Sequence, residues 1–252
     1  MINILVKLIG YPATILHGDA AVFDRYRWLK KNLLSGPLRT LDAGCGSGAF
    51  TMYAAKIGNE AVGISFDKRN NKVAAERAKI LNIPNVNFID GDLRKLDEMS
   101  EVLGKFDQII CFETIEHILN DKKLVKDFFS LLKSGGKLFL TTPYKYYRPL
   151  YGEDKDKVST YEDGGHVRYG YTHEEMADLL KKSGFEIETL EYISGYFSQQ
   201  LINLERFLAS KINPKLAWLI VLPLRLSSFL DLFGGKIIKY PYLSIGVIAV
   251  KK

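Results

Sequence analysis

The chain has 252 residues, of which 47% are hydrophobic and 25% are charged. This suits one large folded domain, or one domain with an appended part, and excludes a disordered, collagen-like or repetitive chain. The net charge is +6, and residues 196–252 carry all of it, since they hold eight basic and two acidic residues. Only two cysteines, Cys45 and Cys111, are present, and the first twenty residues lack the features of a secretory signal, which predicts a reducing, cytoplasmic setting.

Strands and helices are predicted to alternate along the chain. Apolar residues at helical spacing predict five helices, at residues 19–34, 50–57, 72–81, 122–132 and 172–182. Short apolar runs predict seven strands, at residues 38–43, 61–66, 86–89, 106–112, 137–142, 185–193 and 243–250. Apolar strands that alternate with helices form parallel sheets covered on both faces. The predicted fold class is therefore α/β, with a doubly wound, seven-stranded, mostly parallel sheet.

The last two predicted strands are separated by about fifty residues, too many for a hairpin. We predict three parts: residues 1–195 form a core with an N-terminal helix, 196–240 a helical insertion, and 241–252 the last core strand. The apolar run at 216–233 is interrupted by a proline and two charged residues, so it is too short and too charged to span a bilayer. Two interpretations stay open for the insertion: a cap over the substrate, or a basic, apolar element lying on the anionic inner face of a membrane.

One glycine-rich stretch predicts a ligand site, Leu41-Asp42-Ala43-Gly44-Cys45-Gly46-Ser47-Gly48. An acidic residue ends a predicted strand, three alternating glycines follow, and a helix comes next. Ligands of open α/β sheets bind beyond the carboxyl ends of the strands, and glycines let the backbone approach a ligand closely. The spacing differs from the G-x-G-x-x-G of nicotinamide-binding domains.

This stretch resembles motif I of class I S-adenosylmethionine (SAM)-dependent methyltransferases of the type 11 or 12 kind. The resemblance covers about residues 38–193, with 243–250 as the expected last strand. It implies that SAM is the cofactor and that the acidic residue and the glycines hold its methionine end: Asp42, Gly44, Gly46 and Gly48.

The other cofactor contacts implied by the resemblance follow the next three strands. The family normally ends its second strand with a carboxylate that holds the ribose, and Ser65 stands there instead. Asp67, two residues later, either takes over that role or only caps the following helix. The remaining contacts are Asp92 and Leu93 for the adenine, and Phe112 and Glu113 for the methionine moiety.

The run Glu113-Thr114-Ile115-Glu116-His117, directly after a predicted strand, indicates the chemistry. Residues three and four apart on a helical turn share a face, so Glu113, Glu116 and His117 are expected to converge. His166 follows the fifth strand at the same edge of the sheet. These four residues could hold Mg, Mn, Zn or Fe. If no metal is bound, His166 or His117 is the candidate general base, with Glu116 beside it.

A similar E-x-x-E-H run with a distant histidine occurs in ubiquinone-pathway O-methyltransferases and in small-RNA 2′-O-methyltransferases. The predicted function is O-methylation of a small or lipid-linked hydroxylated acceptor, such as a quinone precursor or a sugar, with or without a metal. The alternatives are RNA 2′-O-methylation, carbon methylation of the cyclopropane-synthase kind, and SAM binding without catalysis. Nucleic acid is not favoured, because the basic tail is rich in aliphatic residues.

Overall fold

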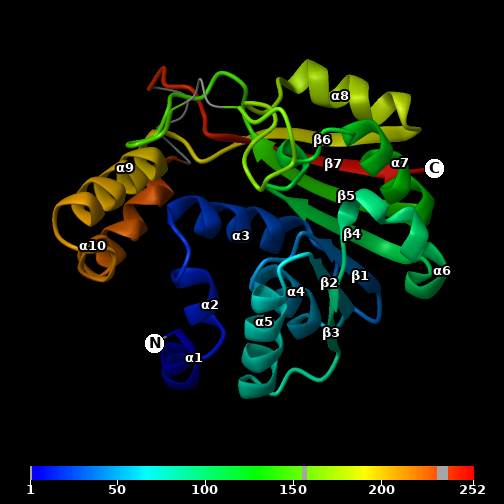
Figure 1. The fold of residues 1–252 in the computed structure, drawn as a ribbon, viewed down its shortest axis with the longest axis horizontal. Helices are drawn as coiled ribbons and strands as arrows, with labels where there is room; N and C mark the ends of the chain where they lie inside the picture. The colour runs from blue at the N-terminus through cyan, green and yellow to red at the C-terminus, as the bar shows by residue number, and fades with distance from the viewer. Residues whose placement is uncertain (1, 155–157, 232–237) are drawn as a thin grey trace.

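The computed structural model describes residues 2–154, 158–231 and 238–252 (Figure 1). A seven-stranded sheet runs through the molecule in the order β3-β2-β1-β4-β5-β7-β6. Its strands are β1 (Arg39–Ala43), β2 (Glu60–Ser65), β3 (Val86–Asp90), β4 (Phe106–Phe112), β5 (Leu132–Pro143), β6 (Phe185–Ile193) and β7 (Ser244–Lys251). β7 pairs antiparallel with β5 and β6, and the other strand pairs are parallel. The predicted fold class is confirmed.

Helices cover both faces of this sheet (Figure 1). On one face lie α3 (Ala20–Asn32), α4 (Ala49–Lys56) and α5 (Lys68–Ile80). On the other lie α7 (Asp121–Leu131) and α8 (His173–Lys182). Short turns of helix fill the loops: η1 (Leu93–Lys95), η2 (Asp97–Met99), α6 (Ser100–Leu103) and η3 (Ile115–His117). Each face has its own buried core, with Met52 and Phe139 in one and Phe106 and Phe128 in the other.

The seven predicted strands and five predicted helices are all present, with shifted ends. α5 begins at Lys68 rather than residue 72, because Asp67 caps it by accepting a hydrogen bond from the Arg69 amide. β5 begins at Leu132 rather than residue 137, because the chain pairs with β4 directly after α7 ends. A capping box formed by Thr172 and Glu175 begins α8. Two N-terminal helices were not predicted, α1 (Ile2–Ile9) and α2 (Pro12–Leu16).

Residues 196–231 of the predicted insertion are helical, and residues 232–237 lie outside the described part of the chain. The helices are α9 (Tyr196–Lys211), α10 (Pro214–Val221) and the 3₁₀ helix η4 (Leu222–Leu230). The buried Arg225 anchors them to the end of α2, since its guanidinium donates to the Leu16 and Gly18 carbonyls and pairs with Glu205 at 2.8 Å. Among the residues that the structure describes, no helix has the length and hydropathy needed to cross a membrane.

Gly48 lies in the turn between β1 and α4 and allows a test of how tightly that turn is packed. Its φ is +79°, and a Cβ there would lie 2.7 Å from both Ala74 Cβ and Phe88 Cε1. Gly152 has nearly the same φ, +78°, with no atom within 4 Å of such a Cβ. We expect Gly48→Ala to lower the free energy of unfolding by about 1–3 kcal/mol more than Gly152→Ala does, because only the first adds overpacking to backbone strain. Urea denaturation measures both losses; equal losses would contradict this account.

Candidate active site

The turn between β1 and α4 exposes bare backbone at the edge of the sheet. Gly44, Gly46 and Gly48 all have positive φ, at +90°, +50° and +79°. A Cβ on Gly44 would overlap the Thr114 side chain, 2.8 Å from its Cγ2, so glycine is required there. The amides of Gly44 and Cys45 donate to the Ile64 carbonyl at 3.0 and 2.9 Å, which ties the turn to β2.

A cavity of about 430 Å³ opens beside this turn, beyond the carboxyl ends of β1 to β4. Seven of the ten cofactor residues predicted from the sequence line it: Gly44, Gly46, Ser65, Asp67, Asp92, Leu93 and Glu113. The other three, Asp42, Gly48 and Phe112, are not among its lining residues. A size of several hundred Å³ and a few converging polar groups are typical of small-molecule sites.

The three residues that do not line the cavity belong to the packing around the turn. The Asp42 carboxylate is buried and accepts a hydrogen bond from the Thr51 hydroxyl at 2.6 Å, and burial raises its pKa to about 6. Gly48 packs against α5, as described above. The Phe112 ring contacts the rings of Trp28 and Phe50, with centroids 5.9 and 5.0 Å away.

Asp67 caps α5 and also lines the cavity, so its cap does not remove it from the candidate cofactor site. It caps α5 through the Arg69 amide, and its carboxylate also pairs with the Arg69 guanidinium at 3.0 Å. The hydrogen bonds from Arg69 hold the pKa of Asp67 below its usual value. The same residue lines the cavity next to Ser65, whose hydroxyl accepts a hydrogen bond from the Asp67 amide at 3.2 Å. The cap therefore leaves an ionised carboxylate at the cavity wall.

Three charged residues that the sequence did not indicate also line the cavity: Arg94, Glu162 and Asp163. Arg94 pairs with Asp92 at 2.6 Å and with Glu162 at 3.1 Å, and its hydrogen bonds lower the pKa of Asp92. Glu162 comes from the long loop after β5 and accepts a second hydrogen bond from the Leu119 amide at 2.7 Å. In the sequence, the one feature that pointed to Glu162 was its position four residues before the predicted site residue His166. This loop thus supplies one wall of the cavity.

Glu116, His117 and His166 come together at the edge of the cavity. One donor atom from each lies within 4.8 Å of the others, and the two imidazoles meet edge to face with centroids 4.7 Å apart. His117 lines the cavity, and its Nδ1 lies 3.0 Å from the Gly165 carbonyl. Burial, followed by the neighbouring His117, lowers the pKa of His166.

Glu116 is fully buried within this cluster. Its Oε2 accepts a hydrogen bond from the Thr142 hydroxyl at 3.1 Å, and its Oε1 has no hydrogen-bond partner among the described residues. Burial, and then the nearby Glu113, raise the pKa of Glu116 well above its ordinary value. The cluster thus contains a buried carboxyl group with free capacity for a proton or a cation.

Glu113, the fourth ligand predicted for a metal, is not part of this cluster. Its carboxylate pairs instead with Arg25 of α3 at 3.2 Å, and its φ is +46°. The backbone leaves the helical path at this residue, so Glu113 and Glu116 do not share a helical face as the spacing predicted. The structure therefore brings three of the four predicted metal residues together.

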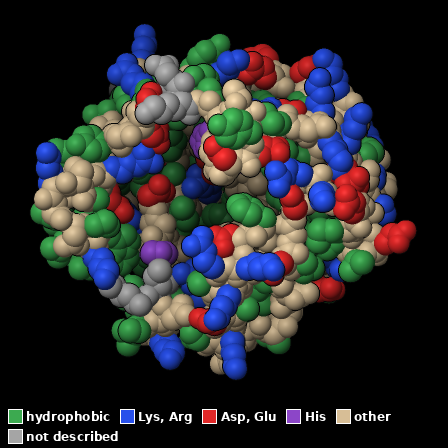
Figure 2. Space-filling view, viewed as in Figure 1, with side chains coloured by type: hydrophobic (Ala, Val, Ile, Leu, Met, Phe, Trp, Pro, Cys, Tyr) green, Lys and Arg blue, Asp and Glu red, His purple; other side chains and the backbone are tan. Residues whose placement is uncertain are grey.

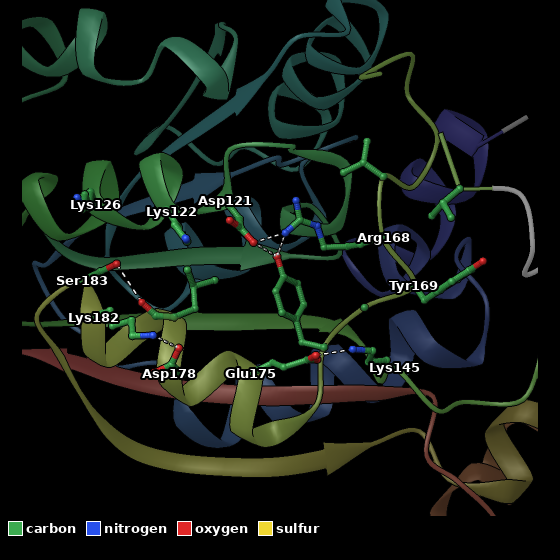
Figure 3. Close-up of a pocket in the computed structure, with 15 residues that line it drawn as sticks. Asp121, Lys122, Lys126, Lys145, Arg168, Tyr169, Glu175, Asp178, Lys182 and Ser183 are labelled. Atoms are coloured by element: carbon green, nitrogen blue, oxygen red, sulfur yellow. Dashed lines mark hydrogen bonds and ion pairs between the residues drawn. The ribbon is translucent and has the colours of Figure 1, made fainter. Parts of the chain in front are cut away.

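Hydrogen bonds hold the segment that carries His166 against the loop after β4. The Val167 amide donates to the Glu116 carbonyl at 3.0 Å. The Arg168 guanidinium donates to the Ile118 and Leu119 carbonyls at 2.6 and 2.9 Å. Arg168 pairs with Asp121 beside a groove of about 670 Å³ between α7 and α8 (Figure 3). The Tyr171 hydroxyl donates to the same carboxylate at 2.7 Å. None of the predicted site residues lines that larger groove, so the smaller cavity is the candidate active site.

A family model described as a methyltransferase domain matches residues 20–190. The chain belongs to this methyltransferase family. Its fold and its relatives make it a class I SAM-dependent methyltransferase, as the glycine-rich turn predicted. The bare turn and the ionised acceptors around the cavity fit a nucleoside with a cationic sulfur.

Two similar curated proteins carry the same name, ubiquinone biosynthesis O-methyltransferase. A ubiquinone biosynthesis O-methyltransferase of Xanthomonas axonopodis pv. citri is 25% identical over 169 residues, which are 65% of this chain and 69% of the relative. The enzyme of the same name from Coxiella burnetii is 29% identical over 118 residues, about half of each protein (47% and 49%).

Solved structures share the fold at low sequence identity. A Galdieria sulphuraria protein assigned as a sarcosine dimethylglycine methyltransferase superposes with a TM-score of 0.64 and 17% identity, covering 92% of this chain and 87% of that one. Coclaurine N-methyltransferase bound to N-methylheliamine and SAH gives a TM-score of 0.58 and 17% identity, over 90% and 71%. At this identity the structures establish the fold alone.

The buried Asp42 predicts a pH dependence of stability. Its pKa rises from 3.8 to about 6 on folding. The protonated side chain therefore stabilises the folded state fully below about pH 4, and this stabilisation is lost as the pH rises through 6. We expect the free energy of unfolding of the native protein, relative to Asp42→Asn, to fall by about 3 kcal/mol between about pH 4 and pH 7. Urea denaturation at several pH values measures this difference.

Asp107→Asn is the matched control for this measurement. The pKa of Asp107 is lowered on folding: hydrogen bonds from Lys133 and Arg39 outweigh the opposing effect of burial. Its contribution to stability therefore appears as the pH rises, with the opposite sign to that of Asp42. A pH-independent difference for Asp42→Asn, or the same sign in both variants, would contradict the assignment.

Proposed function

We propose that this methyltransferase transfers the SAM methyl group to an oxygen atom of a small or lipid-linked hydroxylated acceptor, such as a quinone precursor or a sugar. The observation that carries the proposal is the convergence of Glu116, His117 and His166 at the cofactor cavity. The similarity to ubiquinone biosynthesis O-methyltransferases supports the same class of reaction.

The cluster suits transfer to a hydroxyl because imidazole can take up the hydroxyl proton. The acceptor oxygen attacks the methyl carbon, the C–O bond forms as the C–S bond breaks, and the electron pair returns to sulfur. The positive charge of the sulfonium is lost, and the proton passes to an imidazole nitrogen. Burial lowers the pKa of His166, so at neutral pH this side chain is in the free-base form that the step requires. The pocket supplies in-line positioning.

The same three side chains fit a divalent metal ion. One carboxylate and two imidazoles are a donor set for Mn²⁺, Fe²⁺ or Zn²⁺ more than for Mg²⁺, which prefers oxygen ligands. The buried Glu116 Oε1 without a hydrogen-bond partner among the described residues gives the set an open acceptor. A bound ion would lower the pKa of the acceptor hydroxyl, and the histidines would then act as its ligands.

A lipid-linked acceptor would place the enzyme in the cytoplasm, peripherally on the inner face of the membrane. This part of the proposal is supported by the composition of residues 196–231, which carry more basic than acidic residues and are rich in aliphatic ones. The high share of aliphatic residues disfavours RNA as the acceptor, because aliphatic side chains do not provide the stacking surfaces that bind single strands.

A methyl-transfer assay with His166→Asn tests the proposed reaction. Native enzyme with labelled SAM should convert a catechol to its O-methyl ether, identified by mass spectrometry. We expect His166→Asn to lower kcat by about 10²–10⁴-fold, because the proton acceptor or metal ligand is removed. The affinity for SAH, measured by calorimetry, should change little, because His166 does not line the cofactor cavity.

His173→Asn is the control, since that histidine stacks on Tyr192 outside the cluster. It should retain native activity. A label found on carbon or nitrogen, or a His166→Asn enzyme with native kcat, would reject the proposal.

Metal analysis tests the second role of the cluster. Enzyme purified without chelator or affinity tag should contain about one Mn, Fe or Zn ion per chain by inductively coupled plasma mass spectrometry. Glu116→Gln should lose the ion, because the carboxylate becomes a neutral amide, whereas Glu113→Gln should retain it, because Glu113 lies outside the cluster. Metal-free native enzyme with full activity in EDTA would exclude the metal and leave His166 as the base.

A further inference from the structure

The insertion presents an apolar face to solvent. One side of α10 and η4 is buried against the rest of the protein, through Ala217, Val221, Arg225 and Ser228. The rest of their surface exposes a set of large side chains, here called the aliphatic face: Leu216, Leu219, Ile220, Leu224, Leu226 and Leu230. Leu219 is 55% exposed and Leu226 is 70% exposed. A helix with so many apolar side chains is normally buried on all sides. The exposed aliphatic face is therefore suited to contact with another apolar surface.

Within residues 206–230, every charged side chain is basic. Both arginines of this stretch are neutralised, since Arg206 pairs with Glu153 at 2.7 Å and Arg225 pairs with Glu205 at 2.8 Å. Lys211 and Lys215 at the α9–α10 junction form no ion pair among the described residues, so they give the face a net positive charge.

The N-terminal helix adds to this end of the molecule. α1 exposes Ile4, Leu8 and Ile9 and carries Lys7. It lies at the same end of the long axis as α10, whereas α6 lies at the other (Figure 1). Figure 2 shows hydrophobic side chains on the surface at the α10 end with Lys and Arg side chains among them. Two segments from opposite ends of the sequence thus combine exposed aliphatic residues with cations.

We infer that the aliphatic face docks on an anionic lipid surface. Exposed aliphatic side chains with cationic neighbours match the chemistry of acyl chains beneath anionic headgroups. A two-fold pair of identical chains on this face would bring like-charged lysines together, which disfavours a second copy as the occupant. The inference extends the proposed function, because a lipid-linked acceptor lies in the same bilayer, but the docking itself requires no turnover.

Vesicle flotation of the full chain tests the docking. Vesicles of phosphatidylcholine with phosphatidylglycerol should bind the native protein, and vesicles of phosphatidylcholine alone should bind it much less. Leu219→Asp with Leu226→Asp should lower the bound fraction at least about tenfold, because charge is placed among the acyl chains. Val102→Asp is the control, since Val102 is 89% exposed on α6 at the far end of the molecule.

A pair of lysines tests the electrostatic part. Lys211→Glu with Lys215→Glu should weaken binding to the anionic vesicles at least about tenfold. Lys122→Glu with Lys126→Glu is matched to it, with the same spacing and the same change of charge on an exposed surface of α7. Circular dichroism and SAH calorimetry identify any variant that fails to fold.

Each outcome bears on one proposal. Native protein that does not float with anionic vesicles, or equal losses in test and control variants, overturns the docking. A concentration-dependent dimer that Leu219→Asp with Leu226→Asp dissociates would assign the face to a second copy instead. Methyl transfer to a water-soluble acceptor is measured separately. O-methylation without vesicle binding overturns the docking alone, and vesicle binding with the label found on carbon or nitrogen overturns the proposed function alone.

Discussion

The close contact between Gly44 and Thr114 determines the geometry of the site. The loops after β1 and β4 meet where the strand order reverses, and a side chain on Gly44 would overlap Thr114. Thr114 is held in turn by its hydroxyl, which donates to the Phe112 carbonyl at 2.9 Å. Because Thr114 lies within the E-x-x-E-H run, this contact places the acid and the histidine next to the glycine-rich turn. In the proposed reaction, cofactor binding and proton transfer would therefore share one packing constraint.

A second constraint brings in the distant histidine. His166 lies about fifty residues after His117 in the chain, and nothing in the local sequence orients it toward the cavity. The backbone bond from Val167 to Glu116 and the Arg168 contacts to the Ile118 and Leu119 carbonyls hold it there. The same loop carries Glu162, whose ion pair with Arg94 reaches into the cofactor cavity. Cofactor binding and the position of His166 are thus linked through one segment.

Sequence reasoning succeeded where the determining signal is local. Apolar periodicity located the strands and the main helices, and the three alternating glycines located the turn of positive φ. It failed where a partner lies far away in the sequence. The Arg25–Glu113 pair joins α3 to the loop after β4 and withdraws Glu113 from the predicted metal set. The prediction that Glu113 and Glu116 share a face assumed a regular helix. The positive φ of Glu113 shows that the backbone is not helical at this residue.

The two carboxyl groups of the run divide their roles through their surroundings. Arg25 reaches Glu113 across the top of the sheet and provides a cation for its charge. Glu116 forms no ion pair among the described residues. Burial, and then the nearby Glu113, outweigh the more distant charge of Arg25 and the hydrogen bond from Thr142, so the neutral form of Glu116 is favoured. A buried acid in this state must hold either a proton or a metal ion, and the two imidazoles beside it can serve either arrangement. Under the proposed function, the proton or ion held by Glu116 would therefore determine whether His117 and His166 act as bases or as metal ligands, and the rest of the site is compatible with both.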